Sequence, residues 1–209
     1  MKTLRTLSFG ALALVLAASL TAADMTKFDS QPGSKVKLDG SSNIHDWSVE
    51  GGIIAGTMEL DSKFAADPSK AAPGKIAAKV ETSLPVRSLK SGKTSMDSVM
   101  HTAMKQPQFP KIEYRLTELT LKETPKTAEG PILLESKGNL TVAGVTNAVS
   151  FPVTMTRSGK SLKASGTANV KMTSFGITPP SPKISFGLIT TDDAVKITFE
   201  WNTTVAEAK

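Results

Sequence analysis

The stretch "ILLESKGNLTVAGVTNAVSFPVTMT", residues 132–156, decides the fold class, because its apolar residues recur at every second position. The first half places four apolar side chains on one face, namely Ile132, Leu134, Leu140 and Val142. The second half does the same with Val149, Phe151, Val153 and Met155. Ala143–Gly144 supplies turn chemistry between the halves. Strict alternation gives each strand one buried face and one solvent-exposed face, which predicts antiparallel β-strands.

Similar alternation extends along most of the chain after residue 33. Clear strands are expected at 162–172 and 194–205, and less regular ones at 35–38, 45–51, 56–60, 75–84 and 111–121. Turn residues separate these segments at Asp67–Pro68, Pro73–Gly74 and Ser158–Gly159. The prolines of "TPPSPK", residues 178–183, predict a loop. About eight short strands at this spacing favour a closed barrel or a sandwich.

One segment, residues 94–105, follows a helical period instead. Its apolar residues stand at i, i+3, i+4, i+7 and i+8, namely Met96, Val99, Met100, Ala103 and Met104. We expect an amphipathic helix with Thr94 as its N-cap and Asp97 close enough to support His101. Its apolar face has to pack on the sheet, covering an open end or a flank of the barrel.

The N-terminus has the pattern of a secretory signal peptide. Lys2 and Arg5 precede an apolar run, and small residues stand at Thr21 and Ala23. We therefore expect residues 1–23 to be a signal peptide and residues 24–209 to be a single domain. The run is shorter than the roughly 20 residues that span a bilayer, so we expect no stable membrane anchor, although an anchor is the alternative interpretation. Export without cysteine indicates a periplasmic protein whose stability comes from its core alone.

The charge distribution favours solubility over nucleic-acid binding. The whole chain has a formal net charge of +6, and without Lys2 and Arg5 its 23 basic residues face 19 acidic ones. The lysines are scattered singly and form no stripe. We therefore expect no nucleic-acid partner.

Several motifs together resemble the YceI-like family, over roughly residues 34 to 204. The most specific is "GNLTVAGVTNAVSFPV", with matches at Gly138, Leu140, Thr141, Gly144, Val145, Thr146 and Val149. A second match follows the helix at Phe109, Pro110 and Ile112, and further matches are "SFGI" at 174–177 and "DDAVKITFEW" at 192–201. The resemblance implies an all-β fold with one helix: a lipocalin-like, eight-stranded antiparallel β-barrel with the amphipathic helix packed on it. It also implies a binding protein that holds an isoprenoid or another long lipid in an apolar tunnel.

The sequence departs from the family pattern in its first strands. Residues 41–56 read "SSNIHDWSVEGGIIAG" and lack the phenylalanines of the family's opening. Thr173 and Ser174 stand before Phe175, where the family often has an arginine. Because the first strands form part of the tunnel wall, these differences affect the ligand more than the fold.

The candidate ligand-binding residues come mainly from the helix and the strand interiors. The expected lining is Met96, Val99, Met100, Met104, Phe109, Phe151 and Phe175. Methionine surfaces adapt to flexible ligands, although plain core packing explains them equally well. Small residues at Gly138, Ala164, Gly166 and Ala168 leave room inside a barrel if they point inward; otherwise they face outward or lie at bulges.

Polar residues could meet a lipid head group at the tunnel mouth. His45 and Trp47 share one face of an expected strand, while Asp46 points to the other. Arg87 and Lys90 precede the helix and either meet a phosphate or are simply solvated.

Two other classes of function remain open at this point. One is a hydrolase or isomerase that uses His45 and His101 on a bound lipid. The other is a stress or interaction protein whose interior is filled. We favour a non-enzymatic binding protein without cofactor or metal, because two histidines and no cysteine make a poor metal site. We expect a monomer or homodimer.

Overall fold

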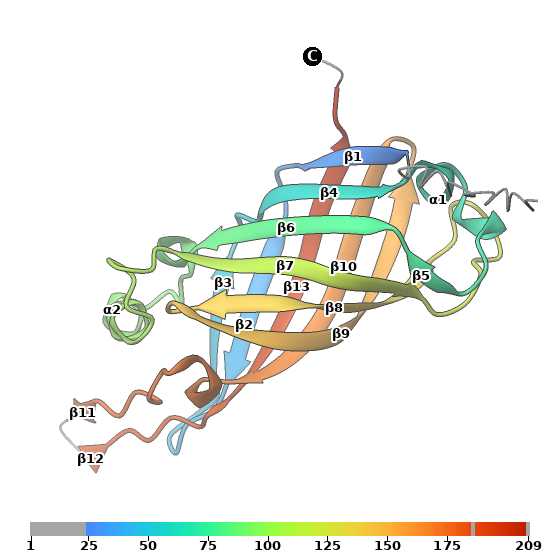
Figure 1. The fold of residues 1–209 in the computed structure, drawn as a ribbon. Helices are drawn as coiled ribbons and strands as arrows, with labels where there is room; N and C mark the ends of the chain where they lie inside the picture. The colour runs from blue at the N-terminus through green and yellow to red at the C-terminus, as the bar shows by residue number, and fades with distance from the viewer. Residues whose placement is uncertain (1–23, 185–186, 208–209) are drawn as a thin grey trace, which may run out of the picture.

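The strands of this protein form an antiparallel sheet that closes into a barrel (Figure 1). The computed structural model describes residues 24–184 and 187–207, so the expected signal peptide lies outside the described residues. The strands are β1 (Met25–Ser30), β2 (Lys35–Gly40), β3 (Trp47–Gly51), β4 (Ala55–Asp61), β5 (Gly74–Ile76), β6 (Ala78–Pro85), β7 (Lys111–Leu121), β8 (Ile132–Val142), β9 (Val145–Ser158), β10 (Ser161–Lys171), β11 (Lys183–Ile184), β12 (Gly187–Leu188) and β13 (Ala194–Val205). The helices are α1 (Ser62–Ala66) and α2 (Thr94–Ala103), with 3₁₀ turns at Pro68–Lys70, Val86–Ser88 and Thr173–Phe175.

The ring runs β1-β4-β6-β7-β8-β9-β10-β13, and β13 pairs back to β1. The predicted eight-stranded antiparallel barrel is therefore confirmed within the described part of the chain. The C-terminal half of β13 pairs with β1, and its N-terminal half pairs with β2. Beyond β2, the strand β3 meets Lys90, because Glu50 and Lys90 exchange two backbone hydrogen bonds of 2.8 Å. This bridge continues the wall at that end of the barrel.

Residues 132–156 contain the paired part of β8 and β9. The register runs from Ile132 opposite Met155 to Val142 opposite Val145. The two turn residues between them, Ala143 and Gly144, have φ values of 50° and 81°. Positive φ at both central residues is what a tight hairpin turn requires, because it matches the twist of the flanking strands.

The structure adds two elements that were not expected and corrects the N-cap of α2. The strand β1 was not predicted, because its sequence MTKFDS has no clear apolar alternation. The helix α1 was not predicted either; Asp61 caps it by accepting from the backbone N–H groups of Lys63 and Phe64 at 3.0 and 2.9 Å. The N-cap of α2 is Lys93 rather than Thr94, and it makes no side-chain capping bond.

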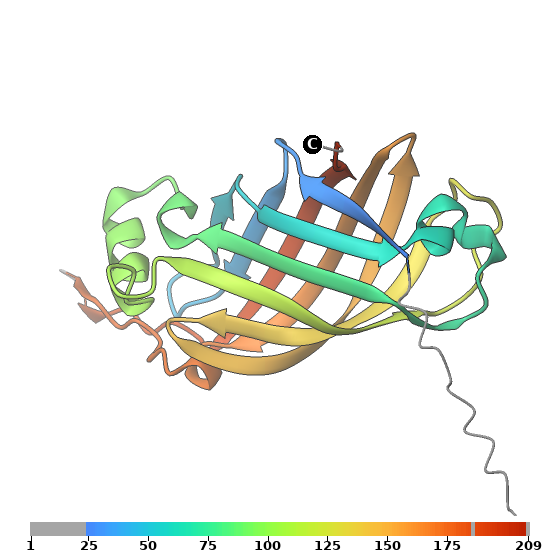
Figure 2. The same cartoon turned by 45° about the horizontal axis from the view of Figure 1, so that its top comes forward.

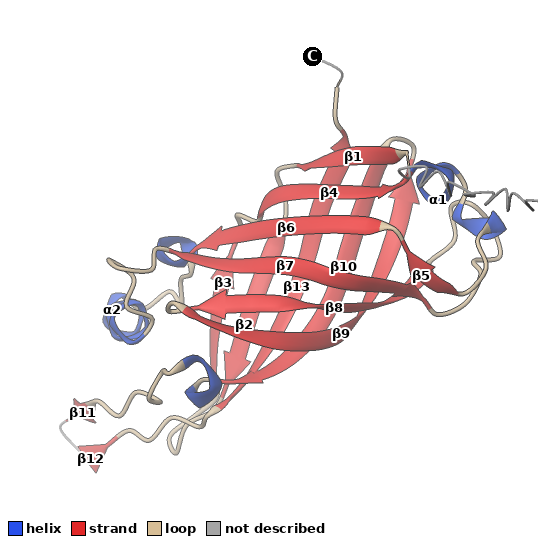
Figure 3. Ribbon diagram, in the orientation of Figure 1, coloured by secondary structure: helices blue, strands red, loops and turns tan. Residues whose placement is uncertain are grey.

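The two ends of the barrel carry different elements, as Figures 1 and 2 agree. The helix α1 lies at one end. The helix α2 and the β11–β12 segment lie at the other (Figure 3). We call these the α1 end and the α2 end.

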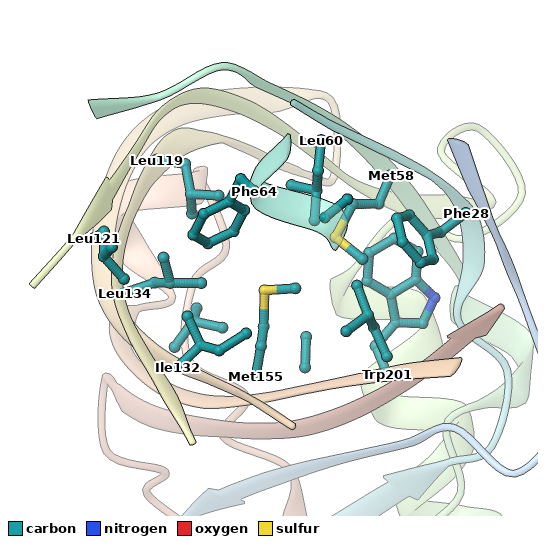
Figure 4. Close-up of a cluster of buried hydrophobic side chains, with 14 of the residues drawn as sticks. Phe28, Met58, Leu60, Phe64, Leu119, Leu121, Ile132, Leu134, Met155 and Trp201 are labelled. Carbon is teal, nitrogen blue, oxygen red and sulfur yellow. The ribbon is translucent and has the colours of Figure 1, made fainter. Parts of the chain in front are cut away.

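The α1 end is filled by a continuous hydrophobic core. Figure 4 shows its side chains converging from the ring, with Met155 pointing into the middle and Phe28, Phe64 and Trp201 around it. Phe28 and Trp201 are buried, and the indole N–H of Trp201 donates to the Ser30 hydroxyl at 2.9 Å. This half meets the requirement that a chain without disulfides has to bury its own core.

A layer of aromatic rings crosses the middle of the barrel. Tyr114, Phe151 and Phe199 come from β7, β9 and β13, with ring centroids 5.5 Å apart for the first pair and 5.8 Å for the second. Tyr114 also shares a 2.7 Å hydrogen bond with the Ser136 hydroxyl. Tyr114 and Phe199 pack against the hydrophobic clusters on both sides. We call these three residues the aromatic septum.

The small residues expected to leave room for a ligand instead leave room for this septum. A Cβ on Gly138 would lie 2.5 Å from the Tyr114 ring, and one on Gly166 would lie 2.9 Å from the Phe199 ring. Ala164 and Ala168 are buried in the core of the α1 end. The inward orientation of these positions was expected, but the space they leave is occupied by the protein's own rings.

We expect Gly138→Ala to lower the free energy of unfolding by about 1–3 kcal/mol, the usual cost of overpacking. The added methyl group would also lie 2.5 Å from the backbone carbonyl oxygen of Arg115, which cannot move aside cheaply. Urea denaturation measures the change. Gly52→Ala is the control, because its nearest neighbour would be 3.9 Å away. Equal stability of the two variants would show that Tyr114 is not held against Gly138.

Candidate ligand-binding cavity

The interior on the other side of the septum is hollow. A cavity of about 530 Å³ lies between the septum and the α2 end, within the ~300–1,000 Å³ typical of small-molecule sites. Its walls are apolar side chains of the strands, and one side is formed by α2. The barrel interior is thus half core and half pocket.

The strand positions of the lining follow from the alternation. On β13, Val195 and Ile197 line the cavity, and Phe199 two residues on belongs to the septum. The strands β7, β8 and β10 contribute in the same way through Ile112, Leu140, Val142 and Val170. Taken together, the inward-facing residues of these strands therefore contribute in turn to the cavity, to the septum and to the filled core.

The apolar face of α2 looks into the cavity. Met96, Val99, Met100 and Ala103 line it and are only half-buried, whereas Met104, at the end of the helix, is buried at 7% exposure. If α2 packed on a filled core, these side chains would be fully buried. Their partial exposure shows that α2 has an apolar surface that the protein itself does not cover.

Polar contacts, rather than burial of its apolar face, hold α2 in place. Asp97 is 7% exposed, and its carboxylate accepts hydrogen bonds from the backbone N–H and the hydroxyl of Ser91, both at 2.7 Å. These bonds, with the Lys90 ammonium 3.6 Å away, hold the pKa of Asp97 below its usual value. His101 lies 3.1 Å, through Nε2, from the Leu89 carbonyl oxygen. Asp97 and His101 thus each tie the helix to the preceding loop, rather than forming the expected pair by hydrogen bonding.

The mouth of the cavity is framed by α2 and two loops. Residues 41–46 contribute Ser42, Ile44 and His45 to the lining. Residues 178–184 and 187–193 contribute Pro180, Pro182, Ile189 and Thr191. Asn43 joins the loops, since its amide donates to the Leu188 carbonyl at 3.2 Å and accepts from the Thr190 N–H at 2.9 Å. The two loops therefore form one rim opposite α2.

His45 and Trp47 both line the cavity near this rim. The Trp47 indole N–H donates to the Ser41 carbonyl at 3.1 Å, and its ring lies against Gly40, where a Cβ would overlap it. His45 is exposed, with Nδ1 2.7 Å from the Asp46 carbonyl oxygen. Trp47 is thus held in place as part of the wall, and His45 lies at the opening.

Of the four other sequence candidates, Phe175 belongs to the described lining and three do not. Phe175 is 3% exposed and lines the cavity beside Ile177. Phe109, Phe151 and Gly166 do not belong to the described lining. Phe109 is 37% exposed, on the turn at Gly144. Phe151 belongs to the septum and Gly166 lies against Phe199, so both are too far along their strands from the mouth.

The lining residues that sequence reasoning missed lie mainly on the rim. Ile44, Pro180, Pro182 and Ile189 come from loops, which have no periodicity to mark an inward face. Val170, Val195 and Ile197 lie on strands that the alternation predicted, but alternation does not tell a filled layer from a hollow one.

Charged groups are scarce at the cavity. Among the described residues, the lining contains one basic side chain, Lys93, and one histidine, His45. His101, the second histidine considered for catalysis, is not among the lining residues.

The described residues also contain no group of three or more histidine and acidic side chains that could hold a metal ion. None of the helices in the described ranges has the length and apolar character needed to cross a membrane.

Fold and cavity together define the class: a lipocalin-like antiparallel barrel with an apolar pocket at one end. A family model described as the YceI-like domain matches residues 24–203. The chain therefore belongs to the YceI-like family. No curated protein matches it significantly.

Solved structures share the fold. BcnA from Burkholderia cenocepacia matches with a TM-score of 0.60 at 17% identity, over 82% of this chain and 96% of that one. A polyisoprenoid binding domain from Saccharophagus degradans matches with a TM-score of 0.62 at 10% identity, over 86% and 98%. The YceI protein of Campylobacter jejuni matches with a TM-score of 0.57 at 12% identity, over 76% and 85%. At these identities the likeness shows the fold alone.

We expect Asp97→Ala to loosen α2 without unfolding the barrel, because the Ser91 N–H and hydroxyl lose their shared acceptor. Hydrogen–deuterium exchange should increase across residues 91–105 and stay unchanged in β7 to β10. Asp46→Ala is the control, since Asp46 is an exposed carboxylate at the same end. An unchanged exchange rate in α2 would mean that the methionine face holds the helix.

Proposed function

We propose that the protein binds an isoprenoid or another long apolar lipid, with its chain in the cavity between the aromatic septum and α2. The observation that carries this proposal is the methionine face of α2, turned toward an apolar space that the protein does not fill. Methionine is unbranched and polarizable, so it repacks readily around a flexible chain. The Saccharophagus degradans neighbour, described as a polyisoprenoid binding domain, supports the same ligand class.

Burial of the chain supplies enough free energy without any catalytic or strongly polar group. Each CH₂ removed from water contributes about 0.8 kcal/mol. Roughly ten such groups would give about 8 kcal/mol, less several kcal/mol for ordering the ligand. We therefore propose a binding role rather than the hydrolase or isomerase considered from the sequence.

The depth of the cavity limits how much of a ligand it can hold. Val195 and Phe199 lie on one face of β13, and four residues of strand rise about 14 Å. A long chain would therefore end against the septum and leave its other end at the mouth, near His45 and Lys93. The filled-core hypothesis applies to the α1 end, where the interior is a packed cluster.

The cellular setting that we propose rests on the sequence. Residues 1–23 would direct export, and residues 24–209 would work as a single domain in the periplasm, as a monomer or homodimer. Export would place the barrel between two membranes, where a lipid has to be shielded from water to move.

We expect Met100→Asp to abolish lipid retention while the circular dichroism signal of the strands persists, because a carboxylate would be buried against the hydrocarbon. Native mass spectrometry of protein from its own host, or after incubation with farnesol, measures retention. Ser98→Asp is the matched control, since Ser98 is exposed on the same helix. Wild-type protein that carries no lipid and takes up no prenyl chain would contradict the proposed function.

We expect Phe199→Ala to open the septum and shift the preferred ligand toward longer chains. Competition among geraniol, farnesol and geranylgeraniol measures the preference. Truncating a large buried aromatic costs about 3–5 kcal/mol, and less is expected here because Phe199 is only half-buried; a thermal melt monitors the fold. An unchanged order of preference in a folded variant would show that the septum does not set the chain length.

A further inference from the structure

The α2 end of the barrel gathers most of the exposed large apolar side chains. Six such side chains stand out among the described residues, and four of them belong to this end, namely Ile44, Phe109, Val145 and Leu188. Ile44 and Leu188 are 52% and 50% exposed on the two rim loops that Asn43 joins. Single exposed apolar residues are ordinary, but several around one opening mark an interaction surface.

The same end has a run of exposed cations. Between residues 86 and 112 the basic residues are Arg87, Lys90, Lys93, Lys105 and Lys111, all exposed, and the one acidic residue is Asp97. Asp97 is buried and bound by Ser91. Its carboxylate also lies 3.6 Å from the Lys90 ammonium. The positive surface on the α2 side of the mouth therefore comes mainly from Arg87, Lys93, Lys105 and Lys111.

The opposite rim has acidic groups. Asp192 accepts from the Ser41 hydroxyl at 2.6 Å, and Asp193 accepts from Thr173. Asp46 is exposed on the neighbouring loop. Carboxylates thus gather on the loop side of the mouth, with Lys171 near Asp193, while cations predominate on the α2 side.

We propose that the α2 end docks on an anionic lipid bilayer, with its cations on the head groups and Leu188 and Ile44 in the interface. Basic residues are attracted to anionic lipid surfaces, and the exposed apolar side chains on the loop side of the same mouth would insert at the boundary. This inference rests on the proposed function, because docking would bring the mouth of the cavity to the membrane. A lipid chain could then enter without crossing water.

Vesicle sedimentation tests this surface with protein purified from cells that express the full chain. Vesicles of phosphatidylglycerol and of phosphatidylcholine are the probes. Wild-type protein should bind the anionic vesicles about ten-fold more tightly, and this preference should fall with added salt. Equal binding to both vesicles, or none, would overturn the proposal.

Variants separate the surface from the cavity. Arg87→Glu combined with Lys111→Glu should weaken anionic-vesicle binding about ten-fold or more, and Leu188→Ser should weaken it further. None of these three residues lines the cavity, so farnesol uptake in solution should stay unchanged. Lys126→Glu combined with Lys160→Glu, and Leu133→Ser, are the matched controls. These exposed residues lie in the β7–β8 loop, in the β9–β10 turn and near the start of β8, and these segments are away from α2 (Figure 1).

The outcomes distinguish the two proposals. Farnesol uptake without vesicle binding would overturn docking and leave the proposed function in place. Vesicle binding without uptake of any prenyl chain would overturn the proposed function and, with it, loading at the membrane. A change in the oligomeric state of Leu188→Ser, measured by light scattering, would mean that a second copy covers this surface and would also overturn docking.

Discussion

The aromatic septum is the constraint on which the rest of the structure depends. Tyr114, Phe151 and Phe199 cross the barrel, and the absence of side chains at Gly138 and Gly166 gives two of these rings their space. On one side, residues of every wall converge into a packed core. On the other side, the walls stand apart around an apolar cavity. One barrel can therefore combine the stability of a filled interior with the capacity of an open one.

The alternation predicted a barrel or a sandwich, and the resemblance to the YceI-like family implied the barrel, but neither predicted this division. The alternation in residues 132–156 predicted the β8–β9 pair with its turn, because a period of two follows directly from strand geometry. The same alternation puts Phe151 on the inward face and says nothing of its depth along the barrel axis. Depth depends on how several strands are staggered around the ring, which no single segment encodes. Gly166 was misread for the same reason, since its neighbour Phe199 comes from another strand.

The helix shows the other limit of sequence reasoning. Its apolar period predicted which side chains face the cavity, and Met96, Val99, Met100 and Met104 all line it. The polar anchor was less visible, because Asp97 binds Ser91 across a turn rather than His101 along the helix. The rim loops gave no periodic signal at all. Residues such as Ile44 and Ile189 become part of the lining only because Asn43 joins their two loops.

The way α2 is held explains how a hollow end can persist in a folded protein. A helix normally gains its place by burying its apolar face, but most of this one's apolar residues stay half-exposed toward the cavity. The hydrogen bonds of Asp97 and the Glu50–Lys90 bridge fix the segment before the helix without using that face. The methionines are then free to contact whatever enters. A ligand with an apolar chain would complete the packing that the strands and helix leave unfinished, so binding would stabilise α2 as well as the ligand.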